Sequence, residues 1–305
     1  MFSSPAIADG VVYCGSDDNH LYAVDLKTGK EKWRFETKNH VSSSPVIANG
    51  VVYFGSGDSY LYAVDVKTGK EKWKFKTGRG IFSTPTLTDS IIYFGSDDNH
   101  LYAVYVSIGQ EKWKFKTESY VFSSPVIADG AVYFGSWDNY LYALDIGTGK
   151  EIWKFKTNAW VSSSPAVADG MVFFGSFDSS LYAVDVKTGV EKWRAKTGGA
   201  VISSPTVAFG VVCFGSKDNY LYAVDVNTGQ KKWKFKTEGD VLSSPVIADG
   251  SVYFGSKDNY IYEVDARTGY ENWKFKTEGS ILSSPVILDE VVYCGSDDHY
   301  LYALK

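Results

Sequence analysis

The stretch Ser43–Thr77, SSPVIANGVVYFGSGDSYLYAVDVKTGKEKWKFKT, decides how this chain folds. The same pattern returns every forty residues along the 305-residue chain, with no insertion or deletion. A fixed period of about 20 to 50 residues is typical of solenoids, propellers and other repeat arrays. The register is marked by one tryptophan in seven copies and one proline in eight: Trp33, Trp73, Trp113, Trp153, Trp193, Trp233 and Trp273, and Pro5, Pro45 and onward to Pro285. We therefore expect one domain over residues 1–305, in which each repeat packs against its neighbours.

Each repeat contains four short segments rich in β-branched and aromatic residues and bounded by Gly, Asp, Asn or Pro, a pattern that predicts strands joined by turns. In chain order, typical predicted strands are Ser43–Ile47, Val132–Ser136, Leu61–Asp65 and Lys72–Thr77, with a turn such as Ala128–Gly130 after the first. Four strands in forty residues indicate one blade of a β-propeller. Proline at the start of the first strand suits an innermost edge strand. Lysines along the fourth strand suit an outer rim that must resist pairing with other sheets.

The blade count follows from the copies of each strand. The first three strands occur eight times, but the fourth occurs only seven times. The expected fold is therefore all-β: an eight-bladed propeller of four-stranded repeats whose last blade lacks its outermost strand. Leu301–Leu304 should form an exposed edge while the circle of blades still closes. Because free edges recruit strands, this edge is a candidate for self-association or for binding a peptide.

The motif Leu-Tyr-Ala-Val-Asp-x-x-Thr-Gly-x-x-x-Trp resembles the tryptophan-docking repeat of the PQQ-like, or quinoprotein-type, β-propellers. The match covers practically the whole chain and includes Ala63, Asp65, Thr68, Gly69 and Trp73 at matching spacing. The resemblance implies that each of these tryptophans docks on the turn of the neighbouring blade. The third repeat departs from the motif, with Tyr and Ile at the Asp and Thr positions (residues 105 and 108), so a looser turn is expected there.

Composition narrows the classes of partner. The net charge of −5 does not favour nucleic-acid binding, which requires a basic face. No apolar run approaches the length that spans a membrane, and no signal peptide is recognised before the first repeat. The family resemblance suggests an extracytoplasmic setting, but the compartment stays open.

Cys14, Cys213 and Cys294 occupy apolar slots of the repeat and are expected to be buried free thiols.

The resemblance also implies an alternative function, PQQ-dependent dehydrogenation with Ca²⁺. Enzymes of that kind hold the quinone on irregular insertions, and the alcohol-oxidising members add two adjacent cysteines. This chain has no insertion and no adjacent cysteines, so we expect no cofactor, no metal and no catalytic residue. The Asp that recurs after Gly-Ser, as in Asp18 and Asp58, is expected to hold a turn through hydrogen bonds to the backbone.

Differences between the repeats point to a binding face. In antiparallel blades, the turn between the second and third strands shares one face with the connection to the next blade. On this face the repeats vary, and large aromatic side chains gather over the fourth and fifth repeats: Tyr120, Trp137, Tyr140, Trp160 and Phe177. Exposed aromatic residues are typical of binding hot spots. The alternative is variation on a surface that binds nothing, or partial burial of these rings.

The sequence therefore predicts a non-catalytic scaffold that binds a protein or peptide through the variable face. Assembly factors of the bacterial envelope and sensor domains are settings in which PQQ-like propellers occur. A PQQ-dependent oxidoreductase and a carbohydrate-binding propeller remain the alternatives.

Overall fold

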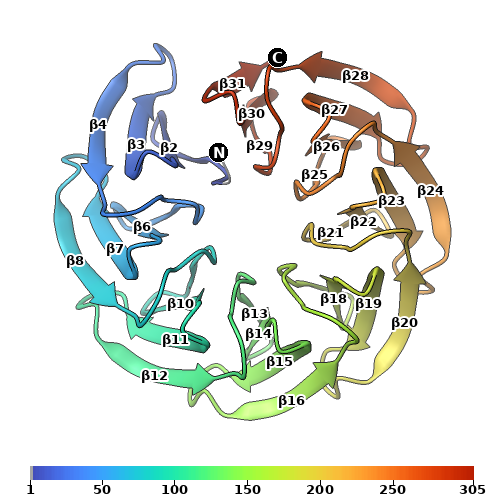
Figure 1. Cartoon of the computed structure of the whole chain (residues 1–305), viewed down its shortest axis with the longest axis horizontal. Helices are drawn as coiled ribbons and strands as arrows, with labels where there is room; N and C mark the ends of the chain where they lie inside the picture. Colours follow the sequence, from blue (N-terminus) through green and yellow to red (C-terminus); the bar gives the residue numbers. More distant parts are fainter. Residues whose placement is uncertain (1–2) are drawn as a thin grey trace.

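The computed structural model describes residues 3–305, and all regular elements in this range are β-strands. They form eight small antiparallel sheets arranged in a circle (Figure 1). Seven sheets have four strands and the last has three. The predicted eight-bladed propeller with an incomplete last blade is confirmed. No helix in the described range is long and apolar enough to cross a membrane.

The first two strands of each blade lie toward the middle of the circle (Figure 1). The innermost strands are β1 (Ala6–Ala8), β5 (Val46–Ala48), β9 (Thr86–Leu87), β13 (Val126–Ala128), β17 (Ala166–Ala168), β21 (Thr206–Ala208), β25 (Val246–Ala248) and β29 (Val286–Leu288). The second strands are β2 (Val11–Gly15), β6 (Val51–Gly55), β10 (Ile91–Ser96), β14 (Ala131–Gly135), β18 (Met171–Ser176), β22 (Val211–Ser216), β26 (Ser251–Gly255) and β30 (Val291–Gly295).

The third and fourth strands form the outer half of each blade. The third strands are β3 (His20–Asp25), β7 (Tyr60–Asp65), β11 (His100–Tyr105), β15 (Tyr140–Asp145), β19 (Ser180–Asp185), β23 (Tyr220–Asp225), β27 (Tyr260–Asp265) and β31 (Leu301–Leu304). The fourth strands are β4 (Glu31–Glu36), β8 (Glu71–Lys76), β12 (Glu111–Lys116), β16 (Glu151–Lys156), β20 (Glu191–Lys196), β24 (Lys231–Lys236) and β28 (Glu271–Lys276).

The innermost strands begin later than the sequence predicted. In the second blade the strand starts at Val46, after the Ser-Ser-Pro segment, and not at Ser43. Proline has no N–H to donate, and the two serines use their hydroxyls to bind backbone groups in place of a strand ladder. In the third blade, for example, the Ser83 hydroxyl accepts a hydrogen bond from the Gly95 N–H at 2.7 Å.

The second serine of each Ser-Ser pair connects neighbouring blades. The Ser4 N–H donates to the Ser44 hydroxyl of the next blade at 2.9 Å. The same bond recurs from the third blade onward, and the last one runs from the Ser284 N–H to the Ser4 hydroxyl, also at 2.9 Å. Between the second and third blades, the Ser43 hydroxyl instead donates to the Ser83 carbonyl at 3.0 Å. The innermost strands of the eighth and first blades are therefore joined like the others, as the prediction of a closed circle required.

The hydrophobic core lies between blades, because alternate residues of a strand face opposite neighbours. On β7, Leu61 and Ala63 pack toward the third blade, while Tyr62 and Val64 pack toward the first. All four side chains are buried. Each complete blade thus contributes to two cores, one with each neighbour.

The tryptophan of the fourth strand closes each of these cores on the outside. The Trp153 indole N–H donates to the carbonyl of Val186 in the next blade at 3.1 Å. A Cβ added to Gly189 would lie 2.7 Å from the Trp153 ring, so only glycine leaves room for the indole. Five other tryptophans dock in the same way on the next blade: Trp33, Trp73, Trp113, Trp193 and Trp233.

Two irregular places were expected, and both differ from the other blades. The turn of the third blade keeps its backbone bond, from the Gly109 N–H to the Tyr105 carbonyl at 2.8 Å. It lacks the hydrogen bonds that Asp65 accepts from Thr68 in the second blade, so it loses side-chain support and not its backbone geometry. In the eighth blade, the edge strand β31 is only partly buried, as expected for a free edge.

Candidate functional site

Hydrogen bonds define the face of the propeller that carries the variable residues. The connection to each blade is bonded to that blade's turn between the second and third strands. For example, the Trp137 N–H donates to the Tyr120 carbonyl at 3.0 Å, and the Phe177 N–H donates to the Trp160 carbonyl at 2.9 Å. The predicted grouping of these loops on one face is correct. These hydrogen bonds place the variable residue of each connection next to the variable residue of the turn that follows it.

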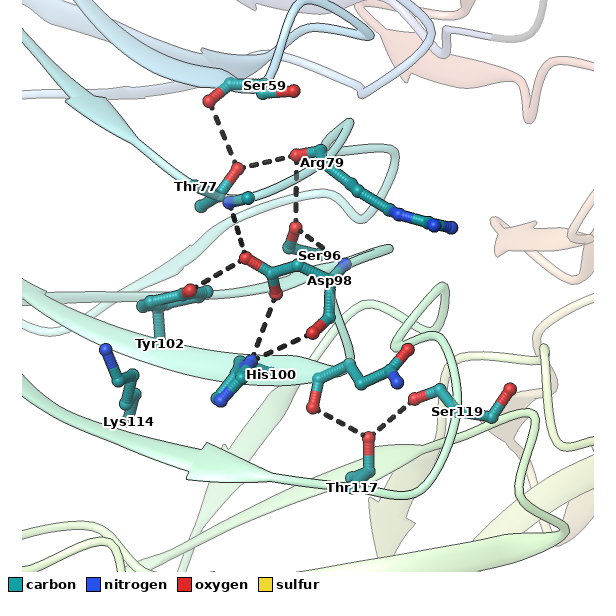
Figure 2. Close-up of polar contacts among 12 residues, drawn as sticks. Ser59, Thr77, Arg79, Ser96, Asp98, His100, Tyr102, Lys114, Thr117 and Ser119 are labelled. Atoms are coloured by element: carbon teal, nitrogen blue, oxygen red, sulfur yellow. Dashed lines mark hydrogen bonds and ion pairs between the residues drawn. The ribbon is translucent and has the colours of Figure 1, made fainter.

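The recurring Asp of this face holds neighbouring blades together. One Asp98 carboxylate oxygen accepts hydrogen bonds from the Tyr102 hydroxyl at 2.8 Å and from the Gly78 N–H of the preceding connection at 2.6 Å. The other oxygen lies 3.3 Å from His100 Nδ1 (Figure 2). The sequence predicted a bond within the turn. The structure adds the bond to the preceding blade, which recurs in the second to eighth repeats, so this Asp has a structural task there.

The centre of the candidate site is a pair of parallel indoles. The ring centroids of Trp137 and Trp160 are 4.4 Å apart, with an angle of 2° between the rings. Phe177 meets Trp160 edge-on, with centroids 5.3 Å apart. The Trp137 indole N–H donates to the Ser162 hydroxyl at 2.5 Å, which fixes the inner indole. Trp160 is 43% exposed, so the outer indole presents its surface to solvent.

The stack continues over the preceding blades. Phe122 stacks on Trp137 at 5.9 Å, and Phe82 stacks on Phe122 at 5.6 Å. We call Phe82, Phe122, Trp137, Trp160 and Phe177 the aromatic row. The sequence prediction missed the two phenylalanines because their slot belongs to the Ser-Ser-Pro segment. That slot is Ser42 in the second repeat and Ser162 in the fifth, so aligning the repeats at it would have revealed them.

Of the five predicted site residues, four meet and one lies apart. Tyr120 contacts Trp137 with centroids 5.5 Å apart, so it joins Trp137, Trp160 and Phe177. Tyr140 instead packs against Tyr142 in its own blade and under Lys154. Tyr140 belongs to β15, where it supports the core between the third and fourth blades. The structure therefore places it outside the aromatic row.

Two cations lie beside these rings, one next to Tyr120 and one at the Phe177 end of the row. The Arg79 guanidinium lies 5.7 Å from the centre of the Tyr120 ring and donates to its hydroxyl at 2.9 Å. The Lys217 ammonium lies 5.4 Å from the centre of the Phe177 ring. Cations over aromatic faces add attraction at exposed sites. An apolar strip with basic groups beside it can therefore contact a partner that combines apolar and acidic side chains.

A polar pocket of about 490 Å³ lies next to the row, lined by Arg79, Asp97, Glu118 and Tyr120 among others. Asp97 occupies the slot that holds Trp137 in the next blade. One of its carboxylate oxygens is buried without a hydrogen-bond partner. Burial raises the pKa of Asp97 to about 6, Arg79 opposes this, and Asp98 adds to it.

The residues present do not fit a quinone and calcium centre. Among residues 3–305, no three His, Cys, Asp or Glu side chains come together as ligands of a metal ion. Cys14, Cys213 and Cys294 are free and buried, and burial raises the pKa of each thiol to about 12. A protonated, enclosed thiol is a poor nucleophile and a poor metal ligand.

The fold and its docked tryptophans define an eight-bladed β-propeller of the PQQ-like repeat class. The model of a protein family described as outer membrane protein assembly factor BamB matches residues 1–119, 74–159 and 119–305. The chain belongs to this family. No curated protein matches the sequence.

Two of the solved structures that match illustrate the shared architecture. BamB from Moraxella catarrhalis is 17% identical with a TM-score of 0.87, and the match covers 98% of this chain and 95% of that one. The computationally designed protein Ika8 is 18% identical with a TM-score of 0.89, and the match covers 99% of this chain and 95% of that one. At this level of identity the two likenesses establish the fold alone.

Proposed function

We propose that this protein is a non-catalytic interaction module that binds a protein partner through the aromatic row. The observation that carries the proposal is the Trp137–Trp160 stack, whose outer indole is 43% exposed although it is held in place by its neighbours. A rigid aromatic surface loses little conformational entropy on binding, and tryptophan is enriched in hot spots.

The surroundings of the row support a protein as the partner. Arg79 and Lys217 lie beside the aromatic rings, and protein interfaces commonly combine a central apolar cluster with a polar rim. The family description, an outer membrane protein assembly factor, is consistent with a scaffold. The net charge of −5 argues against nucleic acid. Self-association through β31 would use another part of the molecule.

The chemistry of the described side chains supports a non-catalytic role. The cysteines are enclosed, and the recurring aspartates such as Asp98 are engaged between blades. The connections are of uniform length because the repeat has no insertion. Long irregular loops, where catalytic groups commonly lie, are therefore missing from the repeat.

Selection from a displayed library of random peptides tests the proposal. Peptides that bind the unaltered chain should lose binding to a variant with Trp137→Ser, Trp160→Ser and Phe177→Ser. The matched control is Val190→Ser, Phe209→Ser and Tyr270→Ser, which removes three apolar side chains, exposed by 61, 75 and 76%, from the turns on the opposite face. This control should bind as the unaltered chain does, and both variants should melt near its melting temperature.

The proposal is wrong if the control variant weakens binding more than the triple variant of the row does. A glycan array that finds a sugar ligand lost in the triple variant would assign the row to carbohydrate. A shift in quinone absorbance on mixing the protein with PQQ and Ca²⁺ would instead favour the oxidoreductase.

A further inference from the structure

The polar pocket beside the aromatic row contains a carboxylate oxygen without a partner. The pocket has a volume of about 490 Å³ and lies between the turn that holds Asp97 and the connection that holds Tyr120. One oxygen of the Asp97 carboxylate is buried and has no hydrogen-bond partner among the described residues. Burying such an oxygen without a donor is unfavourable. An unpaired acceptor on a residue that lines a pocket therefore points to a donor from outside the chain.

The position of Asp97 distinguishes it from the other unpaired oxygens of the described chain. Those belong to residues at turn positions that are Asn or Asp in most repeats, and so to the framework: Asn99, Asn139, Asp178 and Asp218. Asp97 instead occupies a position that varies, with Gly57, Trp137 and Lys217 among its counterparts. The repeat does not require an acid at this position.

The seventh blade shows what kind of group pairs with an acid in this part of the face. There the Lys257 N–H donates to the Asp240 carbonyl at 3.0 Å, and the Lys257 ammonium lies 3.2 Å from the Asp240 carboxylate. The third blade has the same backbone bond, from the Asp97 N–H to the Gly80 carbonyl at 3.0 Å. The acid now lies on the turn, and the connection offers a glycine in place of a cation.

The neighbouring residues of the third blade do not supply the missing cation. A Cβ on Gly80 would lie 2.9 Å from the Phe82 ring, so the first ring of the aromatic row occupies the space that a side chain would need. Arg79 lines the pocket, but its guanidinium donates to the Tyr120 hydroxyl at 2.9 Å. Figure 2 shows the Arg79 side chain extending away from Asp98, the neighbour of Asp97. The buried oxygen of Asp97 is thus left without a donor.

The charges of the pocket select a basic ligand. Three carboxylates line it, from Asp97, Asp98 and Glu118, together with one cation, Arg79. Asp98 is engaged between blades, whereas Glu118 is exposed. An ammonium or guanidinium group carries several N–H donors and a positive charge, and its hydrogen bonds to carboxylates are among the stronger ones in proteins. An anionic ligand would instead be repelled by the net negative charge.

We propose that this pocket binds a lysine or arginine side chain of the partner that lies along the aromatic row. The basic group donates to Asp97, and apolar side chains next to it in the partner pack on the row, which begins at Phe82. Acidic side chains further along the partner meet Lys217 at the Phe177 end. The inference rests on the proposed function and deepens it, because it gives the partner a direction across the face.

A metal ion is a poorer occupant of the pocket. Within residues 3–305, no three His, Cys, Asp or Glu side chains come together as metal ligands, so the three carboxylates of the pocket do not form such a group. Arg79 would also place a positive charge beside the ion. A basic side chain needs fewer acceptors and brings its own donors.

NMR titration of the full chain with n-butylammonium, which has the shape of a lysine side chain, tests the pocket directly. The amide signals of Gly78, Asp97 and Tyr120 should shift saturably, and uncharged n-butanol should leave them unchanged. Asp97→Asn should weaken binding by about tenfold or more, the effect of losing a charge-assisted hydrogen bond. The matched control is Asp89→Asn, which removes an exposed acid from the opposite face of the same blade and should bind like the unaltered chain. Equal binding by Asp97→Asn and the unaltered chain would overturn the proposal, as would no binding at all.

Peptides selected from the displayed library test the link between the pocket and the row. Peptides whose binding depends on Trp160 should carry a Lys or Arg. Its replacement by norleucine should weaken binding to the unaltered chain by about tenfold, but should change binding to the Asp97→Asn variant little.

The outcomes separate this inference from the proposed function. Peptides that depend on Trp160 but carry no basic residue, or carry one whose effect is the same in Asp97→Asn, would overturn the inference and leave the proposed function intact. A selection without peptides that depend on the row would contradict the proposed function. Binding of n-butylammonium through Asp97 would in that case reassign the pocket to a free amine.

Discussion

Each docked tryptophan joins two blades through its indole. Trp153 packs on Tyr133 of its own blade with centroids 5.7 Å apart, donates to the Val186 carbonyl of the next blade and covers Gly189. Trp273 lies at the incomplete junction. Among the described residues, its indole N–H has no hydrogen-bond acceptor. The same residue type therefore occurs in one docked and one undocked setting within a single chain.

Trp153→Ala should lower the free energy of unfolding by about 3–5 kcal/mol, as expected for a large buried aromatic side chain. Trp273→Ala should cost clearly less, because this side chain is half-buried and lacks the docking bond. Urea unfolding of both variants measures the difference. Equal losses would mean that docking does not contribute to stability.

Asp97 makes stability depend on pH. Burial raises its pKa to about 6, while an unfolded Asp titrates near 4. Between these pH values the folded chain holds a proton that the unfolded chain has lost, so the contribution of this group falls as the pH rises through about 6.

Asp97→Asn should therefore be more stable than the unaltered chain at pH 7.5 by about 1 kcal/mol, a value reduced for partial solvent screening. At pH 4 the two should have nearly the same stability. Urea unfolding at both pH values measures this, and the difference between the two proteins isolates Asp97 from the other carboxylates. A stability difference independent of pH would contradict the assignment.

At the scale of elements, the turn after each third strand is the surface on which a tryptophan docks. Gly29 and Gly189 have φ angles of 66° and 68°, so both adopt the same left-handed backbone conformation. They differ in what lies above them. A Cβ on Gly189 would meet the Trp153 ring at 2.7 Å, whereas one on Gly29 would meet nothing within 4 Å.

Gly29→Ala should cost about 1–2 kcal/mol, the usual penalty for a side chain in the left-handed region. Gly189→Ala should cost more, because the added methyl group also displaces the indole. Thermal melts of the two variants separate backbone strain from docking. A Gly29→Ala variant as unstable as Gly189→Ala would argue that strain alone sets the cost.

Much of the arrangement of strands and turns was predictable from the sequence, because the forty-residue period repeats the same local sequence pattern. Strand order, turn positions and the docking of Trp73 followed from the pattern and the family resemblance. The late start of β5 did not, since Ser43 and Ser44 have the composition of a strand end but bond through their hydroxyls. Tyr140 was grouped with Trp137 by proximity in sequence, yet alternation along β15 turns it toward the preceding core.

At the scale of the whole molecule, two systems connect the blades. An inner belt of serine hydroxyls joins neighbouring blades, including the eighth and first through Ser284 and Ser4. An outer belt of tryptophans joins successive blades from the first to the seventh, such as Trp233 to the seventh blade at 3.1 Å. The outer belt is interrupted on both sides of the eighth blade, so we expect unfolding to begin there.

The central claim is that docked fourth strands hold the propeller together and that one junction lacks its strand. Calorimetry of the chain with Val-Lys-Thr-Gly-Lys-Glu-Lys-Trp-Lys-Phe-Lys-Thr added after Lys305 tests it most directly, against a fusion of equal length in which the added Trp and Phe are Ala. The first fusion should melt at a higher temperature than both the unaltered chain and the control, by about 2–4 °C for each kcal/mol gained. Identical melting temperatures for the two fusions would contradict the claim.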